Sequence, residues 1–314
     1  MAAALEESRS IKHQRSIAIM NYKGGVGKTT VTYLLGLYLT LTTGREVLIV
    51  DIDAQCSLTF AVGFQPDEIS LSRHNVYQLV HPTKWPNFSR LRVEDYVKTI
   101  PGLTAAPLYI VPGAFEVDNL DLEITDSIHD RRERGKSEFF LYCKQLINSF
   151  GKYRYVLVDT PPNKMYLTQG LLRACNFFIP VTIPDGISIY GMPRLLQWVQ
   201  QIPDEERPTM LGYVLNGINR SGGSPSGMVV SQQIAVSTLN DALEPYLRQH
   251  DDVATRDEPC LGEIPRLDQI AKFMGADKDV RLDFARHTSG QPTVDRCLKQ
   301  IANSVFARIE RHHA

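Results

Sequence analysis

The stretch from Ile19 to Thr30, IMNYKGGVGKTT, constrains the fold of this 314-residue chain more than any other segment. Gly27, Lys28 and Thr29 match the end of the phosphate-binding pattern G-x-x-x-x-G-K-[ST]. In such a loop, backbone N–H groups and a helix N-terminus hold a polyphosphate, the lysine reaches its terminal groups, and the hydroxyl holds Mg²⁺. The pattern has this meaning only between a strand and a helix, so it predicts both elements around it.

The loop departs from the ordinary pattern at its first position. Tyr22 stands where the first glycine belongs, and the two glycines that follow Lys23 supply conformational freedom inside the loop instead. Lys23 itself is one lysine more than a phosphate loop requires. The residues expected to contact the phosphates are Gly24, Gly25, Val26, Gly27, Lys28, Thr29 and Thr30.

The flanking segments have the expected character. Residues 16–20, SIAIM, are a short apolar run suited to a buried strand, and residues 29–43 form an apolar segment of helical length that ends before Gly44. Further strand-like runs lie at 46–53, 108–113, 155–162, 177–184, 211–216 and 261–265. Strands that are apolar on both faces and alternate with helices predict an α/β fold, with a doubly wound, mostly parallel sheet covered by helices on both sides.

The length and the even recurrence of these segments predict one large domain. We expect a flexible N-terminal segment at 1–15 and a single phosphate-loop domain at 16–314. An irregular, proline-rich insertion is expected at about 66–135.

Composition narrows the range of partners and compartments. The chain has 34 basic and 35 acidic residues, so DNA binding requires a local basic patch rather than a basic chain. No apolar run reaches membrane-spanning length, and the first fifteen residues lack the apolar stretch of a secretory signal, which predicts a cytoplasmic protein. Five scattered cysteines without C-x-x-C spacing fit reduced thiols.

Acidic residues follow two of the predicted strands. Asp51 and Asp53 are two residues apart on one strand, so their side chains share a face and can both point toward the phosphate loop. Asp51 lies deeper and is expected to orient its neighbours, whereas Asp53 can reach an attacking water. Asp159 ends the strand YVLVD, where a carboxylate of such proteins holds Mg²⁺, generally through water. The expected magnesium ligands are Thr29, Asp53 and Asp159.

Three segments, KGGVGKTT, VDIDAQCSLT and VLVDTPPN, resemble in order and spacing the motifs of the ParA/MinD family of deviant Walker-A ATPases. The likeness is greatest to partitioning members and runs over most of residues 16–309, although the segment from about 66 to 135 matches poorly. The resemblance implies that the chain binds ATP and Mg²⁺. It also implies slow, partner-stimulated hydrolysis of ATP to ADP and phosphate.

Carried onto this chain, the resemblance makes Lys23 the signature lysine, which crosses the interface of an ATP-dependent homodimer and contacts the nucleotide of the partner subunit. A cation supplied by a second subunit couples hydrolysis to assembly, as an arginine finger does. The expected catalytic residues are Lys23, Lys28 and Asp53. The family likeness also places Asn216 at the adenine and Pro265 and Arg266 along its wall.

Three functions are compatible with these motifs. In the first, an ATP-bound dimer binds DNA without sequence preference, is nucleoid-associated, and is released when a ParB-like or other adaptor protein stimulates hydrolysis. Such a protein segregates a plasmid, a chromosome region or a protein cargo. In the second, the chain is a MinD-like switch at a membrane surface. In the third, it is an iron–sulfur reductase or carrier of the nitrogenase-iron-protein type.

The sequence favours the first function. Cys175 follows the Asp159 motif, but no second cysteine is placed to share a cluster across a dimer axis. The last helix has an apolar stripe suited to packing on the sheet and no basic amphipathic extension after it, so no membrane contact is expected. Gln269 replaces an arginine of partitioning relatives. The candidates for a DNA-binding patch are Arg220, Lys272, Arg281 and Arg286.

Overall fold

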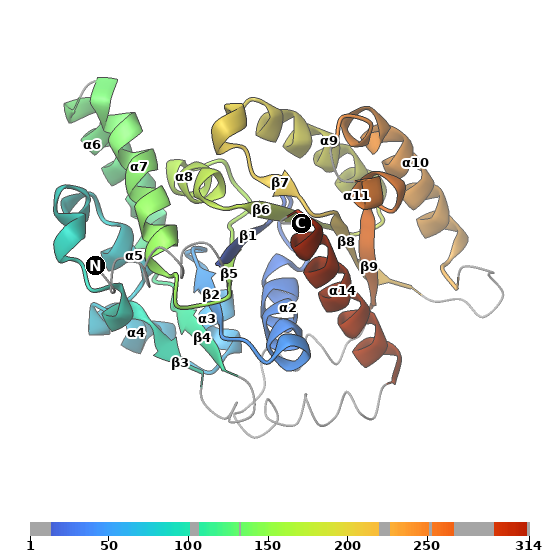
Figure 1. The fold of residues 1–314 in the computed structure, drawn as a ribbon, viewed down its shortest axis with the longest axis horizontal. Helices are drawn as coiled ribbons and strands as arrows, with labels where there is room; N and C mark the ends of the chain where they lie inside the picture. The colour runs from blue at the N-terminus through green and yellow to red at the C-terminus, as the bar shows by residue number, and fades with distance from the viewer. Residues whose placement is uncertain are drawn as a thin grey trace.

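A twisted sheet of nine strands forms the centre of the molecule (Figure 1). The computed structural model describes residues 14–100, 107–131, 133–219, 227–250, 253–266 and 292–312. The strand order is β3-β4-β2-β5-β1-β6-β8-β9, with β7 also paired to β6. The strands are β1 (Arg15–Met20), β2 (Val47–Asp51), β3 (Lys98–Thr99), β4 (Leu108–Val111), β5 (Tyr155–Asp159), β6 (Phe177–Thr182), β7 (Thr209–Met210), β8 (Tyr213–Ile218) and β9 (Cys260–Pro265).

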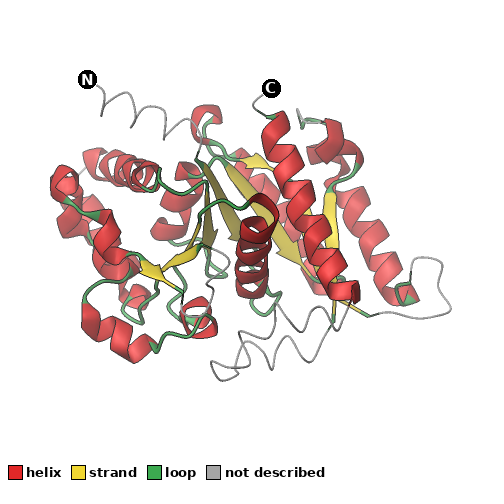
Figure 2. Ribbon diagram, turned by 60° about the horizontal axis from the view of Figure 1, so that its bottom comes forward, coloured by secondary structure: helices red, strands yellow, loops and turns green. Residues whose placement is uncertain are grey.

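Helices cover both faces of this sheet (Figure 2). The described α-helices are α2 (Lys28–Thr43), α3 (Ser57–Ala61), α4 (Pro66–Ser72), α5 (Val76–Val80), α6 (Val117–Asp130), α7 (Glu133–Ser149), α8 (Tyr166–Ala174), α9 (Gly186–Gln200), α10 (Val230–Leu247), α11 (Val253–Asp257) and α14 (Pro292–Arg311). Three short 3-10 helices are η1 (Pro82–Arg90), η2 (Val93–Tyr96) and η3 (Asp204–Glu206).

The expected doubly wound, mostly parallel fold is confirmed. Every pairing is parallel except that of β3 with β4, and each predicted apolar run overlaps a strand. The two short strands β3 and β7 were not expected, because two-residue strands leave no periodic pattern in a sequence. Helix α2 ends as predicted at Gly44, whose φ of 65° is left-handed.

Successive side chains of each central strand enter different cores, which explains why these strands are apolar throughout. In β1, Ile17 and Ile19 pack with α2 and α14, whereas Ala18 and Met20 pack into the core under α5–α10. Alternation of side chains across a strand requires apolar residues at every position when both faces are covered. Helices α2 and α14 lie side by side over the first core (Figure 1), although they come from opposite ends of the chain.

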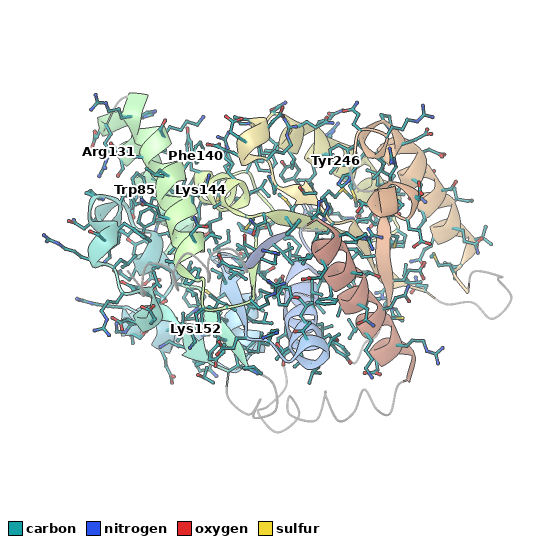
Figure 3. All side chains as sticks on the ribbon, in the orientation of Figure 1. Trp85, Arg131, Phe140, Lys144, Lys152 and Tyr246 are labelled. Atoms are coloured by element: carbon teal, nitrogen blue, oxygen red, sulfur yellow. The ribbon has the colours of Figure 1, made fainter. Side chains whose placement is uncertain are left out.

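The segment expected as an irregular insertion at about 66–135 contains short helices, the edge strand β3, its neighbour β4 and the long helix α6. Proline sets the beginning of two of these pieces: Pro66 is the first residue of α4, and Pro82 is the first residue of η1. Trp85 of η1 is buried against Phe139 of α7, with the Arg131 guanidinium 5.4 Å from its ring centroid (Figure 3). Trp85 and the buried apolar side chains of α5 and α6 therefore belong to the core under α5–α10, whereas Leu108 and Ile110 of β4 face the other core.

Parallel pairing brings the carboxyl ends of β1, β2, β5, β6, β8 and β9 to one edge of the sheet. In sheets of this kind ligands bind beyond that edge. Four adjacent strands end at this edge, and their last residues are Met20, Asp51, Asp159 and Thr182. Residues far apart in the sequence therefore converge on the phosphate loop.

Candidate nucleotide-binding site

The phosphate loop connects β1 to α2, as its motif requires. Gly25 and Gly27 have left-handed φ values of 74° and 91°. A Cβ atom on Gly27 would lie 2.1 Å from Asn216 Nδ2, so only glycine fits there for reasons of both conformation and space. Because Gly27 is also the N-cap residue of α2, no side chain covers the helix N-terminus, and its dipole favours an anion at this position.

Lys28 is the first residue of α2 and is 6% exposed. Its Nζ atom donates a hydrogen bond to the backbone oxygen of Lys23 at 3.4 Å, which is a long contact for a buried ammonium group. Burial lowers the pKa of Lys28, and the nearby carboxylates Asp159 and Asp53 oppose this shift. Because the described residues offer this buried cation one long hydrogen bond, it would gain strongly from a phosphate oxygen.

The two aspartates that follow β2 have different surroundings. Asp51 is fully buried and accepts hydrogen bonds from the backbone N and the Oγ1 of Thr59, at 2.8 and 2.7 Å. These bonds attach α3 to the end of β2. Asp53 is half-buried, accepts from the Gln55 backbone N at 3.0 Å, and acts electrostatically on Lys28. The structure thus gives Asp51 an orienting contact and leaves Asp53 beside the loop.

Asp159 ends β5 directly opposite Asp51 on β2. Its Oδ1 lies 3.1 Å from Thr32 Oγ1, while its Oδ2 is enclosed and has no hydrogen-bond partner among the described residues. Burial and the neighbouring Asp51 raise the pKa of Asp159, against the effects of Thr29 and Lys28. An enclosed carboxylate oxygen of this kind is a position that a bound cation would stabilise.

The donor set around Asp159 fits Mg²⁺ held together with a nucleotide. Thr29 offers a hydroxyl and Asp159 offers an oxygen without a hydrogen-bond partner among the described residues, and both Asp159 and Asp53 act electrostatically on Lys28. Within the part of the chain that the structure describes, no group of three or more His, Cys, Asp or Glu residues forms a metal cage. Mg²⁺ at phosphate sites usually has few protein ligands and keeps waters and phosphate oxygens, so this sparse set is suitable.

The Lys23 side chain is held within its own subunit by two partners on α9 and at its N-cap. Its Nζ donates to Asp185 Oδ2 at 2.7 Å and to Ser188 Oγ at 2.9 Å. Asp185 is the N-cap residue of α9 and also accepts from the Ser188 backbone N. Burial alone would raise the pKa of Asp185, but the hydrogen bonds from Lys23 and Ser188 outweigh it and keep that pKa low.

A cavity of about 650 Å³ adjoins the phosphate loop on the side of β8 and β9. It contains the three residues expected at the adenine, Asn216, Pro265 and Arg266, together with Gly25, Gly27 and Thr30 of the loop. Asn216 Nδ2 donates to the Val26 backbone oxygen at 2.9 Å, so β8 is tied directly to the loop. The structure therefore brings the candidate base contacts and the phosphate contacts into one cavity.

The sequence did not predict several residues that belong to the site. Asn21 is buried and joins the loop to β6, because its Nδ2 donates to Val181 O at 2.7 Å and its Oδ1 accepts from Lys23 N. Gln232 of α10 holds the backbone after Asn216, accepting from Asn219 N and donating to Gly217 O. Asp185, in the sequence IPDGIS, had a usable signal, since an aspartate between a predicted strand and an apolar segment of helical length is typical of an N-cap. Gln232 had none.

Other expectations lie beyond this site. Gln269 falls outside the described residues. So do the four DNA-binding candidates, Arg220, Lys272, Arg281 and Arg286. Cys175, considered for a shared iron–sulfur cluster, is 5% exposed and part of the main core, so it does not face a partner. No helix among the described residues combines the length and apolar character that crossing a bilayer requires.

Comparison with known proteins gives a consistent result. A protein-family model described as an AAA domain matches residues 14–211, which is more than half of the chain and includes the phosphate loop, Asp53 and Asp159. A ParA family protein of Chlamydia pneumoniae is 26% identical over 219 residues, covering 68% of this chain and 75% of that protein. The chromosome-partitioning ATPase Soj of Treponema pallidum is 29% identical over 191 residues, covering 60% of this chain and 64% of Soj.

Among solved structures, the ATP complex of a McdA variant from Cyanothece is similar in fold. The TM-score is 0.68 at 16% sequence identity, covering 95% of this chain and 97% of that chain. At this identity the likeness concerns the arrangement of helices and strands. It extends beyond the residues matched by the family model and includes the segment that contains β8 and β9.

Proposed function

Because the chain belongs to the ParA/MinD family of P-loop ATPases, we propose that it is a partitioning or positioning ATPase that works through an ATP-bound homodimer. The observation that carries the proposal is the convergence of Lys28, Asp53 and Asp159 around a glycine loop at the carboxyl edge of the sheet. The enclosed Asp159 oxygen and the buried Lys28 ammonium complement Mg²⁺ and phosphate.

In the proposed reaction each residue has one task. Lys28 binds the β- and γ-phosphates, and Thr29 and Asp159 hold the metal, which neutralises charge on the phosphates. Asp53 orients the attacking water, because it is a half-buried carboxylate close enough to Lys28 to act on it electrostatically. Asn216, Pro265 and Arg266 hold the adenine in the adjoining cavity.

Lys23 is proposed to act on the nucleotide of the second subunit. In the single subunit its ammonium group is bound by Asp185 and Ser188, so this role requires it to leave those partners when the dimer closes. The Lys23 and Asp185 side chains are 30% and 42% exposed, and ion pairs that water can reach are weak enough to exchange. Dimer closure then supplies a cation where charge develops on the transferring phosphoryl group.

The proposed cargo is moved over DNA. The ATP-bound dimer binds DNA without sequence preference through a basic patch, and an adaptor protein stimulates the hydrolysis that releases it. The names of the relatives, which include a chromosome-partitioning ATPase, support this proposal. The contacts proposed for DNA remain Arg220, Lys272, Arg281 and Arg286, and the balanced net charge of −1 requires such a local patch.

Gel-shift measurements with ATP, ADP and no nucleotide test this function at several salt concentrations. Binding to unrelated duplexes should appear only with ATP and weaken steeply with salt, because several phosphates are neutralised together. Changing both Arg281 and Arg286 to Glu should weaken binding to every duplex equally. The Lys28→Ala variant is the control that should not bind DNA with any nucleotide. Tight binding without nucleotide, or preference for one sequence, would contradict the proposal.

A further inference from the structure

Three side chains from separate segments meet beside the phosphate loop. Tyr22, which replaces the first glycine of the ordinary loop, has its ring centroid 5.7 Å from that of Trp198 on α9. The Lys164 ammonium lies 4.6 Å from the centroid of the Tyr22 ring and 5.6 Å from that of Trp198. Both distances are within the range of cation–π attraction, for which tryptophan and tyrosine are good partners.

The aromatic rings account for this contact, and a conventional ion pair does not. Among the described residues, no carboxylate lies within ion-pair distance of Lys164. The hydroxyl of Tyr22 is enclosed and has no hydrogen-bond partner in the described part of the chain. Tyr22 therefore contributes its ring and not its hydroxyl to the contact.

Each of the three residues is attached to a segment that carries a group of the nucleotide site. Tyr22 directly precedes Lys23 in the phosphate loop, and Trp198 lies on α9, whose N-cap residue Asp185 binds Lys23. Lys164 belongs to residues 160–165, the loop that follows Asp159. The contact thus connects the loop after Asp159 both to the phosphate loop and to α9, which the Lys23–Asp185 contact already joins to each other.

The loop after Asp159 is suited to transmit such a connection. Thr160 fixes its first residue, donating from Oγ1 to the Ile19 backbone oxygen at 2.8 Å. Pro161 and Pro162 follow, and consecutive prolines restrict the backbone of their own and the preceding residues. With one end bonded and the middle stiff, the position of Lys164 determines how the rest of the loop lies against the phosphate loop.

We propose that Lys164, Tyr22 and Trp198 form a clamp that positions the loop after Asp159 against the phosphate loop for ATP hydrolysis. The three are positioning residues, since they act through the loops that carry Asp159 and Lys23. The proposal rests on the proposed nucleotide site but concerns residues outside it. Neither the phosphate-loop pattern nor the acidic motifs assign a role to any of the three.

Steady-state ATP hydrolysis by Lys164→Met and Tyr22→Leu tests the clamp. Loss of a contact of this strength should lower kcat roughly three- to tenfold, while KM for ATP changes by less than about twofold because the cradle is intact. Lys164→Arg and Tyr22→Phe should retain kcat, since a guanidinium and an unsubstituted ring preserve the interaction. The double variant Tyr22→Leu/Lys164→Met should lose no more than either single variant.

Lys152 provides a matched control. Its ammonium lies 5.6 Å from the centroids of both Tyr109 and Tyr153, so it also contacts two rings, although unlike Lys164 it lies 3.9 Å from a carboxylate oxygen, Oε1 of Glu46 (Figure 3 labels Lys152). It precedes β5, at the opposite end of that strand from Asp159. Lys152→Met should therefore leave kcat unchanged. Equal losses in Lys152→Met and Lys164→Met, or additive losses in the double variant, would overturn the clamp.

Tryptophan fluorescence tests the contact without ATP hydrolysis. The chain has two tryptophans, so Trp85→Phe leaves Trp198 as the only indole emitter. In that background Lys164→Met should change the emission intensity of Trp198, and Lys152→Met should not. Unchanged Trp198 emission in Lys164→Met would overturn the clamp even if ATP is hydrolysed. A parent protein that hydrolyses no ATP while this emission change is observed would refute the proposed function and leave the contact established.

Discussion

In the proposed site Lys28 and Asp53 act on the same phosphate group but at different steps, binding and hydrolysis. Lys28→Ala should reduce ATP affinity by roughly tenfold to a hundredfold, because it removes a charge-assisted contact to phosphate. Asp53→Ala should bind ATP within about threefold of the parent protein but hydrolyse it roughly a hundredfold more slowly, since it removes only the group that orients water. Fluorescent-nucleotide titration and single-turnover hydrolysis separate the two. Loss of ATP binding by Asp53→Ala would contradict its assigned role.

Burying the charged carboxylate of Asp159 lowers the stability of the folded protein when no cation is bound beside it. Its pKa is raised by burial and by Asp51, so between the ordinary carboxyl pKa and its own the folded protein retains a proton that the unfolded chain releases. The free energy of unfolding should therefore decrease as pH rises across that window, by at most about 1.4 kcal/mol per pH unit for this group.

Asp159→Asn should reduce that pH dependence and stabilise the nucleotide-free protein near pH 7. Urea denaturation in the presence of EDTA, at pH 5, 6, 7 and 8, measures the effect. Asp51 provides the comparison, because both of its carboxylate oxygens accept hydrogen bonds, one from Thr59 and the other from the Asp53 backbone N, and the single amide oxygen of Asp51→Asn could replace only one of them. A pH dependence of Asp159→Asn equal to that of the parent protein would refute this account.

At the scale of the element, α9 begins where the site needs a rigid support. Asp185 caps the helix through the Ser188 backbone N at 2.7 Å and binds Lys23 with the other oxygen. Asp185→Ala should lower the free energy of unfolding by about 1 kcal/mol, the usual contribution of a helix N-cap. Asp185→Asn keeps an oxygen for the cap and loses only an exposed ion pair, so it should cost less than about 0.5 kcal/mol.

Denaturation of the two Asp185 variants distinguishes the cap from the ion pair. If Asp185→Asn were as destabilising as Asp185→Ala, the charge on Lys23 and not the cap would hold the start of α9. The same pair of variants also removes the Asp185 carboxylate, one of the two partners of Lys23 within the subunit. An earlier onset of ATP-dependent dimerisation in both, measured by light scattering, would agree with exchange of Lys23 between subunits.

At the scale of the whole molecule, the proposed active unit is two subunits, and mixing of variants tests it. Lys23→Ala and Asp53→Ala should each hydrolyse little ATP alone. A mixed dimer has one site in which an intact Asp53 meets an intact Lys23 from its neighbour. Random mixing should therefore recover at most about a quarter of the parent rate. Normal hydrolysis by Lys23→Ala alone would exclude a lysine that crosses between subunits.

The sequence by itself determined the parts of this protein that depend on neighbours along the chain. The apolar runs predicted the doubly wound sheet, because strands covered on both faces must be apolar at every position, as Ile17 and Ala18 illustrate. The phosphate loop was equally legible, since a fixed local spacing of glycines, lysine and threonine creates it. Asp53 and Asp159 could be named because strand ends in a parallel sheet share one edge.

Only the tertiary structure decided which distant side chains meet at that edge. Lys23 and Asp185, which are in contact, lie 162 positions apart in the sequence. The side-chain amide of Gln232, on helix α10, donates to the backbone that follows Asn216. Lys164 gave no signal in the sequence, because a lysine over two aromatic rings is defined by packing and not by spacing. Such contacts depend on how α8, α9 and α10 pack on the sheet, and many different sequences satisfy the same packing.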